Sequence, residues 1–541
     1  MEDEKVKSFS AILHKTVEDE EMAVRDEEEV EELPPSPPRN VEAAKKTAEV
    51  TGDVYNENLG IDDKPSRVEV IGWYLYEFCS YFIITVLIPI VFPLIISQTV
   101  GLPESVSPVH GSSCTDKELR LYQGIASKSI HVKPWHLSPL SWVSASWILG
   151  MIVVTPLLGY LSSHLDYSHT QQLIAGAATL VGAIFCLPAG SLRKMEIFPP
   201  YIAVIVIAHT VAMAAHTRNL GLMIRGFVGP TVNKSQFRIR TGVSTWLSLM
   251  ATASGCSGAG LITAFAYGML VHRDMFISLW VVSIFSAIIW LVGTVHVATA
   301  QRPGVVSPAI SPTVPHIFSI FSFPQGIGAL LGVVLGSFTS MCVFAGGILY
   351  VISHCVEPPH LIHYWLIYFG FPLLALPAMH PLKQLLRANS IKMQIMGLAL
   401  SVFASGVGFY YRKNEWKYGI ALIFAAIQGT STGLLYASGR VVTMDCAPVG
   451  KDGAFAAWHS WARGLGSSIG YTVAVANPGN VSAAFGAAFC IGIAGIVGLI
   501  YGNVNDANGA VAAGHATEWG EKRLPEYAFD KNASGTIFIN S

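Results

Sequence analysis

Long apolar blocks alternate with short polar segments along most of this 541-residue chain. Each block is long enough to cross a bilayer as a helix, which takes roughly 20 residues. Only helices and closed barrels satisfy the backbone in lipid, and these blocks are too long for barrel strands. The pattern therefore predicts an all-α polytopic membrane protein with twelve transmembrane helices. The predicted spans are residues 70–97, 139–161, 171–190, 199–217, 242–270, 275–298, 326–353, 361–380, 393–411, 418–439, 453–476 and 481–502.

Two longer polar segments interrupt this alternation. Residues 98–138 form a long loop, and the proline-rich residues 299–325 separate six spans from six. Such a division is typical of transporters built from two parallel repeats. We therefore expect an N-terminal six-helix bundle at 67–298, a central linker at 299–325 and a C-terminal six-helix bundle at 326–502.

The ends of the chain are polar. Residues 1–66 are acidic and then proline-rich, and residues 503–541 are also polar, so we expect two disordered tails. An even number of spans puts both tails on one side. Lys64 and Arg67 favour the cytosol for both, although the cations between spans are nearly balanced. That count places in cytosolic loops, among others, Arg218, Arg225, Arg240, Arg302, Lys383 and Arg440.

Composition agrees with this class. Apolar residues make up 52% and charged residues 13% of the chain, against about 25% charged in soluble domains. The net charge of −2 gives no electrostatic reason to expect nucleic-acid binding. Most of the eight cysteines fall in apolar blocks, where they act as small apolar side chains. Cys114 and Cys355 fall in loops on one side, which leaves a disulfide between them open.

The first span carries one ionisable side chain, Glu77, about a third of the way along. A carboxylate at that depth costs at least a few kcal/mol unless it faces a cavity, a partner or a proton. The alternative is that it reaches the interface beside Trp73, Tyr74 and Tyr76, which a short side chain does less well than Lys or Arg. We expect Glu77 to take and release a proton, with Trp73 and Tyr74 beside a bound solute.

Spans four and eleven carry further ionisable groups. His209 and His216 share one helical face, so they either relay protons or pack as neutral side chains. Arg463 in span eleven needs an anionic partner. That partner is a carboxylate of the solute, Glu77, or Asp452 near the start of the same helix.

Neutral polar and aromatic side chains complete the set. Gln428, Thr430 and Ser431 in span ten either bind an uncharged part of a solute or join helices by hydrogen bonds. Trp458 and Trp461 in span eleven either line a cavity or pack. We include Gln428, Thr430 and Trp458 among the candidate solute-binding residues.

Two short patterns lie where the spans are joined. One is Gly159-Tyr-Leu-Ser-Ser-His-Leu-Asp166 after the second span, and the other is Pro448-Val-Gly-Lys-Asp-Gly453 before the eleventh. They resemble the major facilitator superfamily, whose loop between helices 2 and 3 reads G-x-L-[AS]-D and whose helix 10–11 region often reads AP…G. Ser163 stands where that family has its Asp, so either Asp166 replaces it or the charge network is weakened. The resemblance implies a gating role for five residues: Gly159, Ser163, Asp166, Pro448 and Gly453.

A narrower resemblance concerns the first span. Gly72-Trp-Tyr-Leu-Tyr-Glu77 looks like the first helix of vacuolar amino-acid effluxers linked to autophagy, which have Asp in place of Glu77. Asp166-Tyr167 is also similar to the first cytosolic loop of that group. The superfamily resemblance implies that helices 1, 4, 7 and 10 line a cavity that opens alternately to each side. The subgroup implies amino acids as solutes and a vacuolar or other endomembrane location, with the plasma membrane as the alternative.

These features predict a secondary active transporter that moves a small solute, amino acids among the candidates, with coupling to protons. The expected partners are the solute, protons, the bilayer and a cytosolic protein that binds the acidic tail. The alternative is a receptor or scaffold on the same fold that transports nothing. No Walker loop or enzyme constellation occurs, and we expect no cofactor. The spacing of His354, Cys355, His360 and His363 fits no zinc motif, and we expect no metal site.

Overall fold

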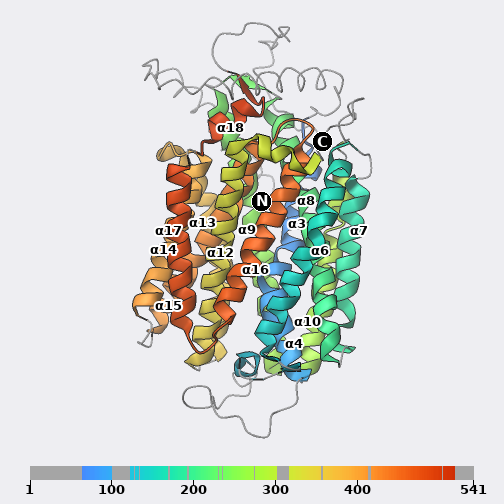
Figure 1. Cartoon of the computed structure of the whole chain (residues 1–541), viewed down its shortest axis with the longest axis vertical. Helices are drawn as coiled ribbons and strands as arrows, with labels where there is room; N and C mark the ends of the chain where they lie inside the picture. The colour runs from blue at the N-terminus through green and yellow to red at the C-terminus, as the bar shows by residue number, and fades with distance from the viewer. Residues whose placement is uncertain are drawn as a thin grey trace, which may run out of the picture.

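The computed structural model describes residues 64–99, 122–126, 128, 130–132, 135–167, 171–191, 194–229, 231–233, 236–272, 275–300, 302, 316–354, 358–411, 416–502 and 504–517. Within these ranges, twelve long helical segments run side by side along one axis (Figure 1). Residues 1–63 of the predicted N-terminal tail, about half of the proline-rich linker and the pair Cys114 and Cys355 lie outside the described residues.

Six helical segments form the N-terminal bundle. Their bounds are α3 (Arg67–Ser80) continued by η1 (Ile83–Val91) and α4 (Phe92–Thr99), α6 (Pro139–Tyr167), α7 (Gln171–Cys186), α8 (Phe198–Val228), α9 (Phe237–His272), and α10 (Met275–Val292) continued by α11 (Val295–Thr299). Short 3-10 turns η2 (Leu187–Ser191) and η3 (Met195–Ile197) lie between α7 and α8. An antiparallel hairpin of β1 (Ile130–Val132) and β2 (Trp135–Leu137) precedes α6.

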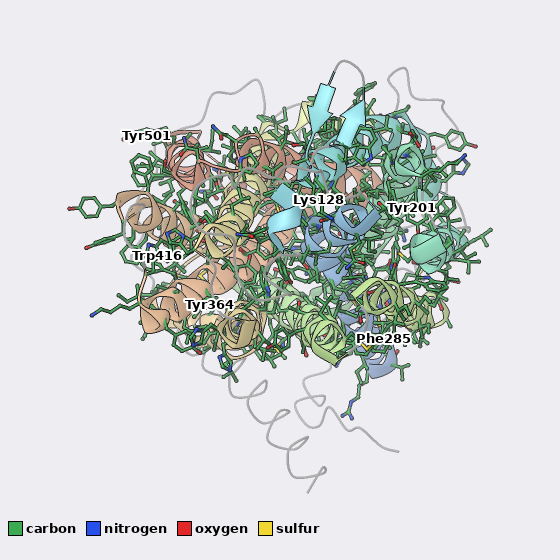
Figure 2. All side chains as sticks on the ribbon, turned by 90° about the horizontal axis from the view of Figure 1, so that it is seen from below. Lys128, Tyr201, Phe285, Tyr364, Trp416 and Tyr501 are labelled. Carbon is green, nitrogen blue, oxygen red and sulfur yellow. The ribbon has the colours of Figure 1, made fainter. Side chains whose placement is uncertain are left out.

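Six more helices form the C-terminal bundle, after the 3-10 turn η5 (His316–Ser322). They are α12 (Pro324–Ser353), α13 (Pro358–Leu385), α14 (Ser390–Tyr410), α15 (Tyr418–Asp445), α16 (Asp452–Val475) and α17 (Val481–Tyr501). Seen along the helices, the two bundles lie beside each other, and Tyr501 lies at the periphery (Figure 2). Its side chain is 82% exposed, as expected of a lipid-facing position.

The prediction of an all-helical, multi-pass membrane protein with twelve spans in two bundles is confirmed. Eleven of the described helical segments are long and apolar enough to cross a bilayer. The twelfth, α16, is less apolar because it carries Asp452, His459, Arg463 and several glycines. Such polar content inside a span marks a helix that faces protein or a cavity and not lipid.

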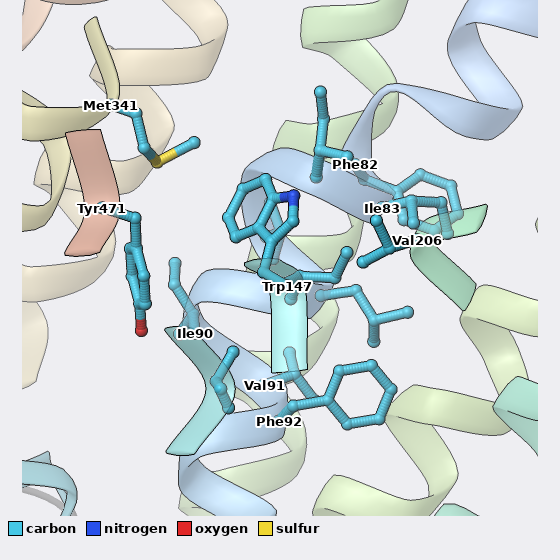
Figure 3. Close-up of a cluster of buried hydrophobic side chains, with 14 of the residues drawn as sticks. Phe82, Ile83, Ile90, Val91, Phe92, Trp147, Val206, Met341 and Tyr471 are labelled. Atoms are coloured by element: carbon cyan, nitrogen blue, oxygen red, sulfur yellow. The ribbon is translucent and has the colours of Figure 1, made fainter. Parts of the chain in front are cut away.

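The first span lies at the centre of the molecule and is not a straight α-helix. Ser66 caps α3 by accepting the N–H of Glu69 at 3.1 Å. The next nine residues, η1, are π-helical and contain Pro89, which has no N–H and whose ring would clash with an α-helical carbonyl. All of η1 is buried, and Trp147 from α6 and Tyr471 from α16 pack beside it (Figure 3).

One prediction about the polar segments is wrong. Several helices continue past the ends of their apolar runs: α8 reaches Val228, α9 begins at Phe237 and α15 ends at Asp445. Six cations that were expected in loops are therefore buried, and four of them lie within these helices. The six are Arg218, Arg225, Arg240, Arg302, Lys383 and Arg440. They stay buried because carboxylates or hydroxyls from distant segments lie against them.

The predicted C-terminal tail is also partly folded. Residues 504–517 contain α18 (Asp506–Ala512) and β4 (Ala516–Thr517). Asp506 accepts the backbone N–H of Ser390 at the start of α14 at 3.0 Å. β4 pairs in parallel with β3 (Val232–Asn233), which joins α8 to α9 in the other bundle. This segment folds because it satisfies open backbone groups of both bundles. We call this end of the molecule, at the top of Figure 1, the α18 end.

Candidate functional site

Glu77 forms a buried ion pair between the two bundles. It lies on α3 and has no exposed surface. Its Oε1 accepts hydrogen bonds from the Arg440 guanidinium and, at 3.0 Å, from the Tyr436 hydroxyl, both on α15. Among the described residues, nothing donates a hydrogen bond to Oε2. One carboxylate oxygen is thus fully used and the other is open.

Arg440 is held by several further groups. Its Nε donates to Ser248 Oγ at 3.1 Å and its Nη2 to Thr252 Oγ1 at 3.2 Å, both on α9. The guanidinium also lies 4.9 Å from the centre of the Trp73 ring and 4.7 Å from that of Tyr436. Partners of this kind offset the cost of burying a cation, which is why the pair is stable in the protein interior.

His216 lies beside the same carboxylate. Its Nε2 is 3.4 Å from Glu77 Oε1, which is a contact without good hydrogen-bond geometry. Its ring stacks on Trp73 with centres 4.9 Å apart, and the Trp73 indole donates to the His216 carbonyl oxygen at 3.1 Å. Trp73 therefore positions an imidazole against the acid.

Arg463 faces a cavity between the bundles. Its guanidinium lies 3.5 Å from the centre of the Tyr436 ring, and its side chain is only 7% exposed. In the described part of the chain it makes no hydrogen bond or ion pair. In this conformation the cavity has room for only a few water molecules, so a solute would enter when the bundles move apart. Its remaining lining residues are Tyr81, Ile84, Thr85, Gly336, Ser337, Ser340, Met341, Phe344, Tyr368, Thr432, Leu435, Tyr436 and Ser467.

A second space lies on the other side of Arg463, toward the N-terminal bundle. It has room for one or two water molecules and shares Ile84, Tyr436 and Arg463 with the first. His209 on α8 and His459 on α16 line it, and neither has a hydrogen-bond partner at Nε2 among the described residues. Arg463 thus stands between two polar spaces that run between the bundles.

The patterns at the joins between spans meet at the α18 end. Asp166, at the end of α6, accepts the N–H groups of Gly453 at 2.6 Å and of Ala454 at 3.0 Å, at the start of α16. A carboxylate there is favoured by the helix dipole and by the open N–H groups of the first turn. A side chain at Gly453 would come within 2.6 Å of Leu165, so glycine permits this approach.

An ion pair reinforces the same contact. Arg225 on α8 donates to both oxygens of Asp452 at 2.8 and 2.7 Å, a bidentate pair that joins the bundles. Gly221 on α8 leaves the space that Asp452 occupies. Lys451 packs over the Phe323 ring just before α16, and burial lowers the pKa of its ammonium, an effect that Asp166 partly opposes.

The remaining residues of the predicted gating set lie nearby but outside these contacts. The Ser163 hydroxyl donates to the Tyr160 carbonyl oxygen of its own helix, and Gly159 faces Ile317 of η5. The carbonyl oxygen of Pro448 accepts the N–H of Lys451 in the turn before α16. Asp166, three residues after Ser163, therefore makes the contacts between the bundles.

Five predicted solute-binding residues do not line the cavities. The Trp73 and Tyr74 rings pack together on α3. Gln428 accepts the Ser401 hydroxyl from α14 at 3.1 Å, and the Thr430 hydroxyl donates to a carbonyl of its own helix. Trp458 donates to the Ile317 carbonyl oxygen at 2.8 Å. For Gln428, Thr430 and Trp458 these contacts are the helix-joining or packing alternatives to solute binding.

Arg440 and Tyr436 are the residues that sequence reasoning missed. Arg440 was assigned to a loop because it follows the end of an apolar run. The spacing offers a signal, since positions 436 and 440 lie one turn apart on one helical face. An aromatic hydroxyl and a guanidinium on the same face, near a membrane carboxylate, would have suggested this site. In the described part of the chain, no three His, Cys, Asp or Glu side chains gather to hold a metal ion.

The backbone is similar to those of known transporters. Over 81% of this chain it matches all of a bacterial homologue of the iron transporter ferroportin in its outward-facing state (TM-score 0.50, 12% identity). It also matches all of the human organic anion transporter MFSD10 (TETRAN), again over 81% of this chain (TM-score 0.51, 11% identity). The chain has the major facilitator fold. No family model matches the sequence, and a search of the curated proteins found no match.

Proposed function

We propose that this chain is a secondary transporter that carries a small, carboxylate-bearing solute through the cavity between its bundles. The observation that supports this is Arg463. It is a deeply buried guanidinium that faces a cavity and makes no hydrogen bond or ion pair with a carboxylate among the described residues. Glu77 attracts it from a distance but is already bonded to Arg440. An arginine in a membrane interior needs an anion to offset its desolvation, and a bound solute supplies one.

The cavity wall also bears on the solute class. Its described lining residues offer hydroxyls from serine, threonine and tyrosine, together with Phe344 and Met341, but no Asp or Glu. An organic acid with an apolar or aromatic body suits this wall. An amino acid, which the resemblance of the first span suggests, would place its ammonium against hydroxyls and aromatic rings. MFSD10, whose backbone is similar, is an organic anion transporter.

Proton coupling is the second part of the proposal. A proton on Glu77 would neutralise the carboxylate and weaken its bond to Arg440, which joins α3 to α15. Loss of that attraction in a buried site frees the two bundles to move apart. The ion pair thereby links protonation to the rearrangement that exposes the cavity on one side.

The experiment is uptake into proteoliposomes of two radiolabelled compounds, phenylalanine and 3-phenylpropionate. They differ only in the amino group, so their ratio separates amino acids from organic acids. Protein-free vesicles give the passive background. We expect saturable uptake of at least one compound and its reduction about tenfold or more in Arg463→Gln, since a hydrogen bond to a charged group contributes roughly 1.5–3 kcal/mol.

The matched control is Arg67→Gln, which removes an exposed arginine at the start of α3. It should transport like the wild type. If the Arg463→Gln variant takes up the compound at the wild-type rate, this arginine does not bind the solute. If neither compound enters, the proposal that the chain carries small aromatic acids fails.

Glu77→Gln tests the coupling separately. The amide keeps the shape of the side chain but cannot lose a proton. We expect accumulation driven by a pH gradient to disappear while exchange of labelled for unlabelled solute continues. Accumulation with unchanged dependence on the gradient would show that Glu77 carries no proton.

A further inference from the structure

A third polar space lies inside the N-terminal bundle, apart from the two that adjoin Arg463. It lies between α3, α7, α8 and α11, has room for one or two water molecules and shares no lining residue with the others. Its polar lining includes Gln171, Gln172, His216, Asn219 and His296. We call it the side chamber. The solute cavity and the side chamber thus approach Glu77 from different directions.

A line of polar groups runs through the side chamber toward Glu77. Gln172 and Asn219 are partly exposed, whereas His296 and His216 are buried. Asn219 Nδ2 lies 3.3 Å from His296 Nε2. The centres of the His296 and His216 rings are 5.3 Å apart, and His216 Nε2 is 3.4 Å from Glu77 Oε1. The steps between successive groups are short enough for proton transfer directly or through one water.

Four atoms along this line have no hydrogen-bond partner among the described residues. They are His296 Nδ1, both ring nitrogens of His216 and Glu77 Oε2. The three side chains that carry them are more than nine-tenths buried. An unsatisfied buried polar atom costs roughly 1–3 kcal/mol, so four of them in one line are not explained by packing alone. Water in the chamber would satisfy them and connect them.

We propose that the side chamber is the proton route to Glu77, with His296 and His216 as the relay. The inference rests on the proposed proton coupling. Each imidazole accepts a proton on one ring nitrogen and releases one from the other, so neither ring changes its net charge. The proton arrives on the Glu77 carboxylate, which becomes neutral and releases Arg440. Protons and solute then reach the site by separate paths.

The charges around the route are compatible with this role. Two cations line the side chamber, Arg218 and Arg302, and each faces a carboxylate: Asp166 lies 4.0 Å from Arg218, and Glu69 lies 2.6 Å from Arg302. At the inner end, Arg440 is paired with Glu77, while Arg463 and His209 lie beyond the pair, toward the solute cavity. Paired cations repel an incoming proton much less than bare ones do.

The test compares solute-driven proton movement with solute exchange in proteoliposomes of the full chain. The vesicles contain the pH-sensitive dye pyranine, which reports proton entry when solute is added outside. The solute is phenylalanine, or 3-phenylpropionate if only that compound is carried. Counterflow of labelled against unlabelled solute reports the solute cycle without net proton movement. Two variants address the route: His296→Gln removes a relay group, and Ala175→Leu narrows the chamber without touching an ionisable side chain.

We expect both variants to reduce proton entry per solute at least about tenfold, a smaller effect than the roughly 10²–10⁴-fold that a positioned proton-transfer group contributes. Counterflow should stay within about twofold. The control is His380→Gln on α13, a histidine that lines none of the three spaces. If protons enter at the wild-type rate in both variants, the proposed route is wrong. An equal loss of counterflow would also overturn it, because the residues would then serve the solute cycle.

The failure of the proposed coupling gives a different result. In that case the wild type carries solute without any proton entry, and the side chamber has no proton to deliver. If only the proposed route is wrong, the wild type and both variants all show proton entry when solute is added. The pyranine signal of the wild type therefore separates the two cases.

Discussion

The two ends of the interface between the bundles are closed by different kinds of contact. At the α18 end, Asp452 is paired with Arg225 in two short bonds, and Asp166 binds the first N–H groups of α16. At the opposite end, the Ser144 and Thr472 hydroxyls are 2.7 Å apart. The Tyr471 hydroxyl there donates to the Pro89 carbonyl oxygen at 3.3 Å. One end depends on buried charge and the other on neutral hydrogen bonds and packing.

The difference predicts that the two ends resist separation of the bundles unequally. Removing one partner of a buried ion pair leaves an uncompensated charge, which costs roughly 3–5 kcal/mol. A neutral hydrogen bond contributes only about 0.5–1.5 kcal/mol. Single substitutions should therefore have large effects on closure at the α18 end and small effects at the opposite end. The predictions below run from the largest expected effect to the smallest.

The largest effect is expected for Asp452→Ala. Arg225 loses its bidentate partner, and we expect the closed form to lose about 3–5 kcal/mol. The reporter is Cys446, a buried thiol after α15 that is covered by Gly509 of α18 and whose pKa is raised by burial. Its labelling by a maleimide, followed by mass spectrometry, should become at least tenfold faster.

The control for that prediction replaces both partners. Arg225→Gln with Asp452→Asn leaves no unpaired charge, so Cys446 labelling should lie between the single variant and the wild type. If Asp452→Ala labels at the wild-type rate, the ion pair does not hold this end closed.

A smaller effect is expected for Gly453→Ala. The added Cβ would lie 2.6 Å from that of Leu165 and 3.0 Å from Asp166 Cγ, so α6 and α16 must separate slightly. Overpacking of this kind costs roughly 1–3 kcal/mol. Cys446 labelling should rise less than in Asp452→Ala. Gly470→Ala, which meets the Phe338 backbone within the C-terminal bundle, should lower the thermal stability without faster labelling.

The span pattern and two of the key side chains were accessible from the sequence alone. Glu77 and Arg463 stand out because each is a charge inside an apolar run. Asp166 and Gly453 were found through short patterns, and in the structure the Asp166 carboxylate accepts the Gly453 N–H. Arg440 and Arg225 were missed because a span of about 20 residues ends before them, whereas the helices continue.

The reason for this miss is physical. A helix continues past its apolar run when another segment supplies the opposite charge, and that segment is distant in sequence. Arg225 and Asp452 are 227 positions apart, and Arg440 and Glu77 are 363 apart. Periodicity and composition describe neighbours along the chain, so they cannot reveal such pairs. The folding of residues 504–517 onto both bundles was missed for the same reason.

A moderate effect is expected for Asp506→Asn in the C-terminal segment. Asp506 accepts hydrogen bonds from the Ser390 N–H and, at 3.1 Å, from the Asn389 side chain. An amide can keep one of these but loses the charge, at a cost of about 1 kcal/mol. Since α18 covers Cys446, its labelling should rise modestly. A wild-type rate would mean that Asp506 does not hold α18 in place.

The smallest effect is expected for Ser144→Ala at the opposite end. The substitution removes one neutral hydrogen bond, to Thr472, worth about 0.5–1.5 kcal/mol. We expect a drop of a few degrees at most in the midpoint of thermal unfolding and no change in Cys446 labelling. A loss of stability as large as that of Asp452→Ala would remove the distinction between the two ends.

The most direct test of the account is whether the two ends open in turn around the cavity. Double electron–electron resonance between two spin labels measures the separation of the bundles. One pair of labels is placed at His164 and Arg387 at the α18 end, and another pair at Ile197 and Tyr411 at the opposite end. The account predicts that adding solute or changing pH lengthens one distance while the other shortens or stays closed. Two distances that never change, or that lengthen together, would contradict a carrier with alternating access.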